Sequence, residues 1–341
     1  MERQALYFTG PHRVRVAPEP LPRPGVGQAL VQSLISAISG GTELLIYRGL
    51  APRDLPKDDT LPALAGTFEF PLKYGYAVVG RVVETGPGVD PAWQDRLVFA
   101  FHPHESHFLA SPDELLPVPE DLAPEEAVFF PNLETALTLL LDGQPLVGEQ
   151  VAVFGQGIVG LLLTALLAAW PLASLVTLDL YPKRRLASET LGAQASLDPA
   201  APDALARLLT QLQGPRPYAG ADLTFEVSGN PGAMDQAIAA TGFAGRVVIG
   251  SWYGLRRVEL NLGGRFHRSR VRLISSQVSS LPLELSGRWQ RERRRQTTWD
   301  LLNRLRPAHL ITQRFPLAQA AQAYELLDKN PADIIQVILT Y

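Results

Sequence analysis

Two patterns of apolar and polar positions divide the chain. Over roughly the first 120 residues, short apolar or alternating runs are separated by glycine and proline, which is typical of β-strands joined by turns. The runs that predict strands are residues 28–35, 77–84, 96–101 and 107–109. Residues 51–71 are rich in proline and predict a long loop. A helix is expected to begin at Pro124, because proline and the acids after it suit a first helical turn.

From about residue 149 onward, short apolar runs alternate with helical patterns at a spacing of 25–30 residues. The runs that predict strands are residues 150–154, 175–179, 221–227, 246–249 and 271–275. Helices are expected after the first strand up to about residue 170, over 183–193, and from Pro231. This alternation indicates βαβ units and a parallel sheet. The pattern beyond residue 280 is helical, until an apolar strand at 334–339 ends it.

Length and composition limit the kind of protein this can be. The chain has 341 residues, enough for about two domains, and 46% of them are hydrophobic, as in globular proteins. It has no cysteine, which excludes disulfides, thiol nucleophiles and cysteine-based zinc sites. The longest apolar run, residues 158–169, is too short to span a bilayer, and the first residues do not resemble a secretory signal. We therefore expect a cytoplasmic protein with no membrane partner.

Basic residues are concentrated late in the chain. Residues 256–306 contain 13 arginines and only four acids. A basic stripe of this kind can bind nucleic acid, but no nucleic-acid motif accompanies it. We expect a solvated or cofactor-side face and no nucleic-acid partner. The alternative from another functional class is a catalytically weak cofactor- or RNA-binding protein.

A glycine motif follows the strand at 150–154. Gly155, Gly157 and Gly160 form GxGxxG where the strand leads into a helix, and Asp179 ends the next strand. In this motif the first glycine allows the turn, the second lets the backbone approach a pyrophosphate, and the third lets the helix pack on the strand. Asp179 is placed to accept ribose hydroxyls, which favours NAD(H) over NADP(H). The expected cofactor-binding residues are Gly155, Gln156, Gly157, Ile158, Val159, Gly160, Asp179, Ser228 and Ser251.

Over nearly its whole length the chain resembles the medium-chain dehydrogenase/reductase superfamily. The resemblance rests on the glycine motif with Asp179 and on the segments ISGGTELLIYRG, LKYGYAVVGRVVETGPGV, DRLVFAF, ADLTFEVSGNPGAMDQA, GRVVIGSWYG, FHRSRVRLISSQVSS and FPLAQAAQAYELLDKNPADIIQVILT. The GTE and SWYG segments look closest to the branch that contains the bacteriochlorophyllide hydroxyethyl dehydrogenase. The resemblance implies an α/β fold, with a GroES-like β-rich catalytic domain at 1–122, a Rossmann domain at 123–278, and a return to the catalytic domain at 279–341. It also implies a homodimer.

The chain departs from the family at the catalytic zinc. Zinc-dependent members have Cys in C-G-T-D, His in G-H-E, and a Cys or Glu before the mid-chain helix. Those positions fall on Ser39 or Gly40, on Tyr76, and on Pro131 or Asn132. None of these side chains is a good zinc ligand. The four-cysteine structural zinc lobe is also absent. We therefore expect no zinc and no metal site at the family position.

Several polar residues are candidates for the chemistry in place of zinc. Three histidines, His102, His104 and His107, lie within FHPHESH, and His102 and His104 would share a face if that segment were extended. Three interpretations remain open for them: no role, substrate binding or proton transfer, and a relocated metal site. The resemblance implies that Thr42 relays protons and that Glu43 is structural. The expected catalytic residues are Tyr76, His104, His107, Thr42, Ser39 and Glu134.

These observations predict an NAD(H)-dependent oxidoreductase that interconverts a small-molecule alcohol and carbonyl without zinc. The oxygen of the substrate would be held by hydrogen bonds, with Tyr76 as one donor, unless Tyr76 only fills the vacated metal pocket. The alternative within enzymes is a quinone or enoyl reductase, which also needs no zinc. Such reductases usually prefer NADPH, so Asp179 counts against that alternative.

Overall fold

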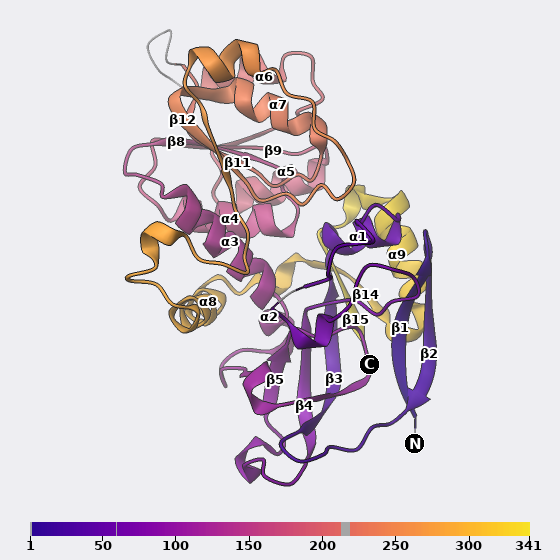
Figure 1. The fold of residues 1–341 in the computed structure, drawn as a ribbon. Helices are drawn as coiled ribbons and strands as arrows, with labels where there is room; N and C mark the ends of the chain where they lie inside the picture. Colours follow the sequence, from indigo (N-terminus) through magenta and orange to yellow (C-terminus); the bar gives the residue numbers. More distant parts are fainter. Residues whose placement is uncertain (1, 59, 213–218) are drawn as a thin grey trace. The chain divides into compact units, whose positions relative to one another are not determined.

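The computed structural model describes residues 2–58, 60–212 and 219–341. The chain forms two compact units: unit 1 comprises Met1–Pro131 and Trp299–Tyr341, and unit 2 comprises Asn132–Thr298 (Figure 1). The boundaries expected after residues 122 and 278 lie earlier in the chain than these. The predicted α/β fold class is confirmed. One unit contains a parallel sheet with helices on its faces, and the other unit is rich in β-strands.

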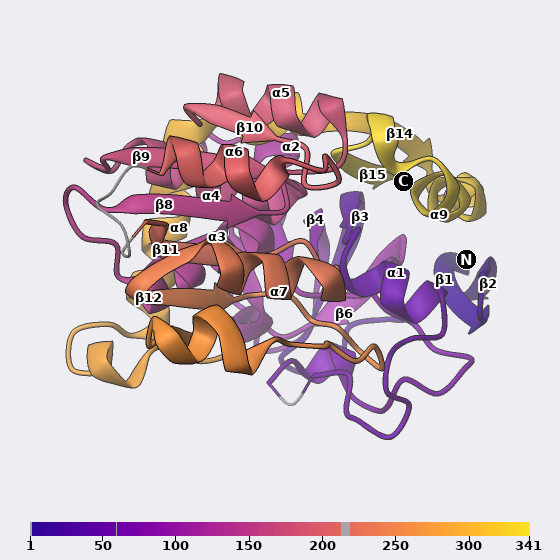
Figure 2. The same cartoon turned by 90° about the horizontal axis from the view of Figure 1, so that it is seen from above.

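Unit 2 is built on a six-stranded parallel sheet. Its strands are β8 (Gln150–Phe154), β9 (Ser174–Leu178), β10 (Ala195–Leu197), β11 (Ala221–Glu226), β12 (Thr241–Ile249) and β13 (Arg272–Ser275). Its helices are α4 (Ile158–Ala168), α5 (Pro182–Thr190), α6 (Ala204–Gln211) and α7 (Pro231–Ala240), and it includes most of α3 (Phe130–Gly143) and part of α8 (Arg291–Leu305). Helices α4 and α5 cover one face of the sheet and α6 and α7 the other (Figure 1), and Figure 2 looks onto the second face.

The strand order of this sheet identifies where a ligand would bind. The order is β10-β9-β8-β11-β12-β13, so it reverses direction between β8 and β11. Open parallel sheets bind ligands beyond the carboxyl ends of their strands at such a reversal. The glycine motif lies at this point, directly after β8.

Unit 1 combines the first part of the chain with its last part. Its strands are β1 (Glu2–Gly10), β2 (Arg13–Pro20), β3 (Ala29–Ile38), β4 (Val78–Thr85), β5 (Leu97–Ala100), β6 (His107–Ala110), β7 (Leu115–Pro117), β14 (Ile311–Pro316) and β15 (Gln336–Thr340). Its helices are α1 (Thr42–Tyr47), α2 (Pro124–Ala127) and α9 (Ala320–Lys329). The main sheet has the order β14-β15-β3-β4-β5-β7, with β6 also paired to β3, while β1 and β2 form a separate hairpin.

A hydrophobic core fixes the position of α1 in unit 1. The β1–β2 hairpin, α1 and α9 all contribute to it, and Phe8, Ile46 and Tyr324 are among its fully buried side chains. The ring of Tyr324 stacks on that of Tyr47, with centroids 5.6 Å apart. Because α1 is anchored by this core, the residues at its first turn are held in place at the end of β3.

Most predicted elements are present, and several further elements were not predicted. The strands expected in unit 1 correspond to β3, β4, β5 and β6, and the helices expected at Pro124 and Pro231 begin at those residues. Residues 51–71 contain one short 3₁₀ turn, Pro62–Leu64. The β1–β2 hairpin, α1, β10, α6 and β14 were missed. Within the described parts of the chain, no helix combines the length and the apolar character needed to cross a membrane.

Candidate active site and dinucleotide site

Three hydroxyl-bearing residues meet at one end of the main sheet of unit 1. The pairing of β3 with β4 brings the residues after Ile38 beside those before Val78. Tyr76 Oη donates to Ser39 Oγ at 2.6 Å, and the backbone N–H of Thr42 lies 3.4 Å from the same Ser39 oxygen. All three side chains are partly exposed. We refer to Ser39, Thr42 and Tyr76 as the hydroxyl cluster.

The hydroxyl cluster offers neutral hydrogen-bonding groups. Burial raises the pKa of the Tyr76 phenol above its usual value of about 10, although its hydrogen bond to Ser39 acts in the opposite direction. The phenol therefore keeps its proton at neutral pH and remains a hydrogen-bond donor. Zinc sites use thiolate, imidazole or carboxylate ligands, so this set of groups does not fit the metal.

Directly beneath the cluster lies a buried carboxyl group, that of Glu43. Its Oε1 accepts the Ser39 backbone N–H at 2.8 Å, and its Oε2 accepts from His104 Nε2 at 3.0 Å and from the Tyr324 hydroxyl. Glu43 and His104 are both 0% exposed. Three donors thus converge on one carboxyl group, which links α1, α9 and the segment around His104.

His104 uses both of its ring nitrogens within the protein. Nε2 faces Glu43, while Nδ1 lies 2.7 Å from Ser36 Oγ, and that oxygen lies 2.8 Å from Tyr341 Oη. Because a carboxylate can only accept, Nε2 carries a proton and donates it to Glu43, while Nδ1 forms the hydrogen bond with Ser36. Gly75 has a φ of +129°, and a Cβ there would lie 2.8 Å from the His104 ring. His104 is therefore tightly enclosed and supports the cluster from below.

The other two histidines of FHPHESH have different surroundings. His102 stacks on Phe108 with ring centroids 4.0 Å apart, and burial lowers its pKa to about 3. Burial also lowers the pKa of His107. The condition under which His102 and His104 would share a strand face is not met, because residues 101–104 form no strand. His102 packs on Phe108, whereas His104 lies between Glu43 and Ser36. Across residues 2–58, 60–212 and 219–341, no three His, Asp or Glu side chains are arranged to hold a metal ion.

Glu134 lies on α3 and forms a buried ion pair. Arg294 Nε of α8 donates to Glu134 Oε1 at 3.1 Å, and Arg294 also contacts Thr138 Oγ1 at 3.2 Å. Other arginines of the 256–306 segment are likewise engaged: Arg265 donates to the Thr241 carbonyl, and Arg306 to that of Asp121. These three arginines connect parts of the chain to one another.

In unit 2 the three glycines of the turn have three different surroundings. Gly155 has a φ of +97°, and a Cβ on it would lie 2.5 Å from Ser228 Cα. A Cβ on Gly160 would lie 2.0 Å from the Gly155 carbonyl oxygen. A Cβ on Gly157 would meet no protein atom within 4 Å. The first two glycines are thus required by the fold, whereas Gly157 faces open space at the start of α4.

Asp179 and Gln156 shape this turn. Asp179 Oδ2 accepts the Gln156 backbone N–H at 2.7 Å, and Oδ1 accepts that of Tyr181 at 2.9 Å. A carboxylate has about four acceptor positions, so each oxygen retains capacity for a hydroxyl donor. The Gln156 side chain is fully buried and bonds Thr164 and the Gly155 carbonyl. No side chain caps α4, whose first N–H groups and positive dipole end suit a phosphate.

Glu226, which the sequence analysis did not select, organises the neighbouring loops. It ends β11, is 0% exposed, and accepts from the backbone and side chain of Ser228 and from the Tyr253 hydroxyl. Ser251 Oγ accepts the Gly229 N–H at 2.8 Å. Ser228 and Ser251 are thereby held beside the glycine turn. A lone acid at the end of an apolar strand was the only sequence signal for this role.

Comparison with known proteins shows extended similarity to dehydrogenases. No family model matches the sequence. The chain is 30% identical to (R,R)-butanediol dehydrogenase of Bacillus subtilis (strain 168) over 236 residues, which is 61% of this chain and 66% of that enzyme. It is 24% identical to an uncharacterized zinc-type alcohol dehydrogenase-like protein of Escherichia coli (strain K12), with 95% of each chain aligned.

Solved structures show the same fold. The crystal structure of 2R,3R-butanediol dehydrogenase from Bacillus subtilis superposes with a TM-score of 0.80 at 20% identity and covers 99% of both chains. An alcohol dehydrogenase from E. coli CFT073, complexed with NADH, gives a TM-score of 0.79 at 17% identity and covers 100% of this chain and 99% of its own. A dehydrogenase from Sinorhizobium meliloti 1021, bound to NADP, gives 0.77 at 19% identity and covers 100% of both chains.

Proposed function

We propose that this alcohol dehydrogenase-like oxidoreductase, whose relatives are zinc-type members of the medium-chain dehydrogenase/reductase superfamily, interconverts an alcohol and a carbonyl compound with NAD(H) and without catalytic zinc. The observation that carries the zinc-free mechanism is the contact between Tyr76 and Ser39. These two residues stand where the resemblance puts two zinc ligands, and their hydroxyl oxygens lie 2.6 Å apart. Assignment to the bacteriochlorophyllide hydroxyethyl dehydrogenase branch remains a prediction.

The residues of unit 2 fit a dinucleotide. Gly157 leaves open space at the uncapped start of α4, and Asp179 presents a carboxyl group at the end of β9. We assign the pyrophosphate to the N–H groups of Ile158, Val159 and Gly160, and the adenosine ribose to Asp179. The side chains of Gln156 and Glu226 position this turn from within the protein. When bound, the nicotinamide supplies or accepts the hydride.

The hydroxyl cluster of unit 1 holds the substrate oxygen in this proposal. Tyr76 donates its phenolic proton to that oxygen as charge develops on it, and Ser39 and Thr42 exchange protons with Tyr76 and solvent. His104 is a positioning residue, because it is enclosed between Glu43 and Ser36. Glu134, paired with Arg294, holds α3 against α8. His107 remains a candidate for substrate contact, since its side chain is partly exposed.

The carboxyl group of Asp179 predicts the cofactor preference. NADH should bind at least about tenfold tighter than NADPH, because charge-assisted hydrogen bonds to ribose hydroxyls are worth roughly 1.5–3 kcal/mol and a 2′-phosphate would be repelled. Asp179→Ser should reduce this preference for NADH. Asp198→Ser is the control and should leave the preference unchanged; Asp198 lies 3.7 Å from its nearest cationic partner, Arg185. Fluorescence titrations of both dinucleotides measure the ratio. Equal or tighter NADPH binding by the native chain would contradict the prediction.

Substitutions at Gly157 and Gly160 should distinguish an effect on cofactor binding from an effect on folding. Gly157→Ala should lower NADH affinity at least about tenfold with an unchanged Tm, because the added methyl meets only the space left for the pyrophosphate. Gly160→Ala should lower the Tm, because its methyl collides with the Gly155 carbonyl. Titration and thermal unfolding of both variants provide the comparison. Native NADH affinity in Gly157→Ala would exclude the pyrophosphate from this turn.

Chelation tests the zinc-free mechanism directly. The hydroxyl cluster lacks zinc-binding chemistry, so we expect elemental analysis after chelator treatment to find far less than one zinc per chain. NAD(H)-dependent turnover, found by screening alcohols and ketones at the nicotinamide absorbance, should survive the treatment. Loss of turnover on chelation with recovery on adding Zn²⁺ would overturn the mechanism while leaving the reaction class intact.

A further inference from the structure

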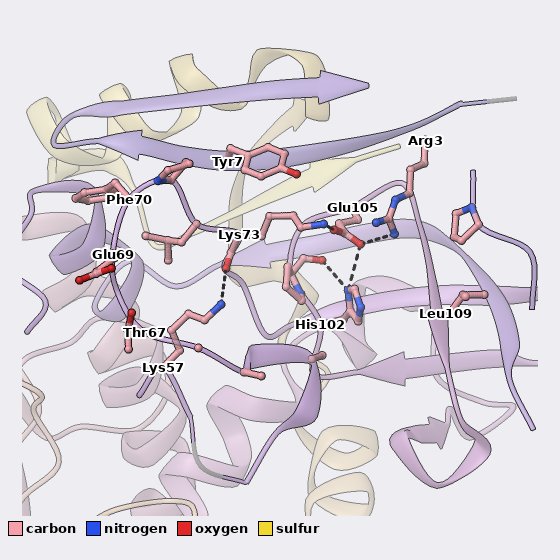
Figure 3. A pocket seen from close by; sticks show the side chains of 17 residues that line it. Arg3, Tyr7, Lys57, Thr67, Glu69, Phe70, Lys73, His102, Glu105 and Leu109 are labelled. Atoms are coloured by element: carbon pink, nitrogen blue, oxygen red, sulfur yellow. Dashed lines mark hydrogen bonds and ion pairs between the residues drawn. The ribbon is translucent and has the colours of Figure 1, made fainter. Parts of the chain in front are cut away.

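A pocket of about 760 Å³ opens on unit 1 and shares no residue with the hydroxyl cluster (Figure 3). Its walls come from β1, from the loop around residues 57–73, and from the segment at 102–109. The volume is in the range of pockets that hold small organic ligands. Most of its polar lining consists of charged side chains, so charge is the feature that distinguishes possible ligands.

One wall of the pocket is internally neutralised. Arg3 pairs with Glu19 at 2.6 Å and with Glu105 at 2.8 Å. Lys73 Nζ lies 3.2 Å from Glu19 and also contacts Glu105. Two cations thus face two carboxylates in a closed network, as the dashed contacts around Glu105 in Figure 3 show in part. This wall has no charge left over for a ligand.

Lys57, on the opposite wall, has no such partner. Its Nζ lies 3.5 Å from the Lys73 carbonyl oxygen, and among the residues the structure describes no carboxylate forms an ion pair with it. An ammonium group has three donors, so at least two of them have no acceptor among the residues that the structure describes. Burial, together with the Lys73 charge, lowers the pKa of Lys57. A partly desolvated cation of this kind gains most from an anion.

A second donor lies beside Lys57. Residues 56 and 67 form an antiparallel bridge, and the Lys57 backbone N–H donates to the Gly66 carbonyl at 2.8 Å. Thr67 is exposed, and its hydroxyl makes no hydrogen bond within the described chain. The remaining acid of the lining, Glu69, is exposed, and its side chain extends away from Lys57 (Figure 3).

We infer that this pocket binds an anionic group, a carboxylate or a phosphate, with Lys57 Nζ as the charged contact and Thr67 Oγ1 as the second donor. A phosphate or carboxylate has the oxygen acceptors that an ammonium and a hydroxyl on adjacent segments can share. The ion pairs of Arg3 and Lys73 stiffen the facing wall and leave Lys57 as the group that recognises charge. This site is independent of the proposed oxidoreductase reaction and can be tested without turnover.

The test uses the four lysines of the chain, at positions 57, 73, 183 and 329, as internal references. The full-length protein is labelled briefly with trinitrobenzenesulfonate at constant ionic strength, with inorganic phosphate, malonate or chloride present, and each lysine is quantified by peptide mass spectrometry. We expect phosphate or malonate to slow labelling of Lys57 at least threefold, while Lys183 and Lys329 react at unchanged rates. Protection by only one of the two anions identifies the ligand class and supports the site.

Two variants complete the test. Thr67→Val should reduce the protection of Lys57. Where phosphate is the protecting anion, Lys57→Met should also abolish the saturable line broadening of inorganic phosphate in ³¹P NMR that the native protein produces with its dinucleotide site filled by excess NADH. Both side chains lie in a surface loop, so a matching Tm verifies folding. No protection of Lys57 by either anion, or equal slowing at Lys183, would overturn the proposal.

Discussion

Replacing Tyr76 with phenylalanine is expected to lower kcat by about 100-fold with NADH affinity unchanged. In the proposed mechanism no metal polarises the substrate oxygen, so the phenolic proton meets the charge that develops there, and such donors contribute roughly 10²–10³-fold. The substitution removes one oxygen atom and the bond to Ser39 and leaves the ring in place. Steady-state kinetics with NADH titration measures both quantities.

Tyr74→Phe is the matched control for this experiment. Tyr74 lies two residues away, and its ring packs edge-on against that of Tyr76 with centroids 6.1 Å apart, but its hydroxyl belongs to no described hydrogen bond of the cluster. The kcat of the Tyr74→Phe variant should equal that of the native enzyme. A fall confined to KM in Tyr76→Phe would show that the hydroxyl only binds substrate. Full activity would remove Tyr76 from the mechanism and make His107 the next residue to test.

Replacing Glu43 with leucine is expected to destabilise unit 1 by at least about 3 kcal/mol. The carboxyl group accepts from Ser39, His104 and Tyr324, and each buried donor left without an acceptor costs roughly 1–3 kcal/mol. For a unit of this size the expected fall in Tm is roughly 6–12 °C. Thermal unfolding followed by circular dichroism measures it.

Two further variants serve as an intermediate case and as a control for Glu43→Leu. Glu43→Gln keeps one acceptor oxygen and should lie between the native chain and Glu43→Leu. Glu325→Gln breaks an exposed pair with Lys329 and should leave the Tm unchanged. A native Tm in Glu43→Leu would show that the three donors find other acceptors, and that the carboxyl group does not tie α1 to α9.

The sequence predicts unit 2 well because its signals are local. The strand at 150–154, the glycine turn and Asp179 lie within 30 consecutive residues, and each has a recognisable spacing. Strand β10 was missed because its three residues are too few to show a period. In the β1–β2 hairpin, β2 has no fully buried residue, so the apolar alternation that predicts a strand is weak there.

The buried residues that hold the hydroxyl cluster in place could not be predicted in the same way. Glu43, His104 and Tyr324 come from three distant parts of the sequence, and only the folded chain shows that they meet. The sequence offered His104 as a catalytic candidate, whereas the fold closes around its ring and engages both of its nitrogens within the protein. The hydroxyl cluster was easier to predict, because the resemblance to zinc-dependent dehydrogenases already pointed to Ser39, Thr42 and Tyr76.

The position of β15 has a consequence for how the protein is made. This strand lies between β14 and β3, although all of unit 2 separates it from β3 in the sequence. On the ribosome, β3 therefore emerges long before its neighbour, and residues 35–38 keep an open strand edge while unit 2 is synthesised. Unit 2 has all its strands contiguous and can form first. The unfinished first unit is then the species most exposed to aggregation, and the one that chaperones would protect.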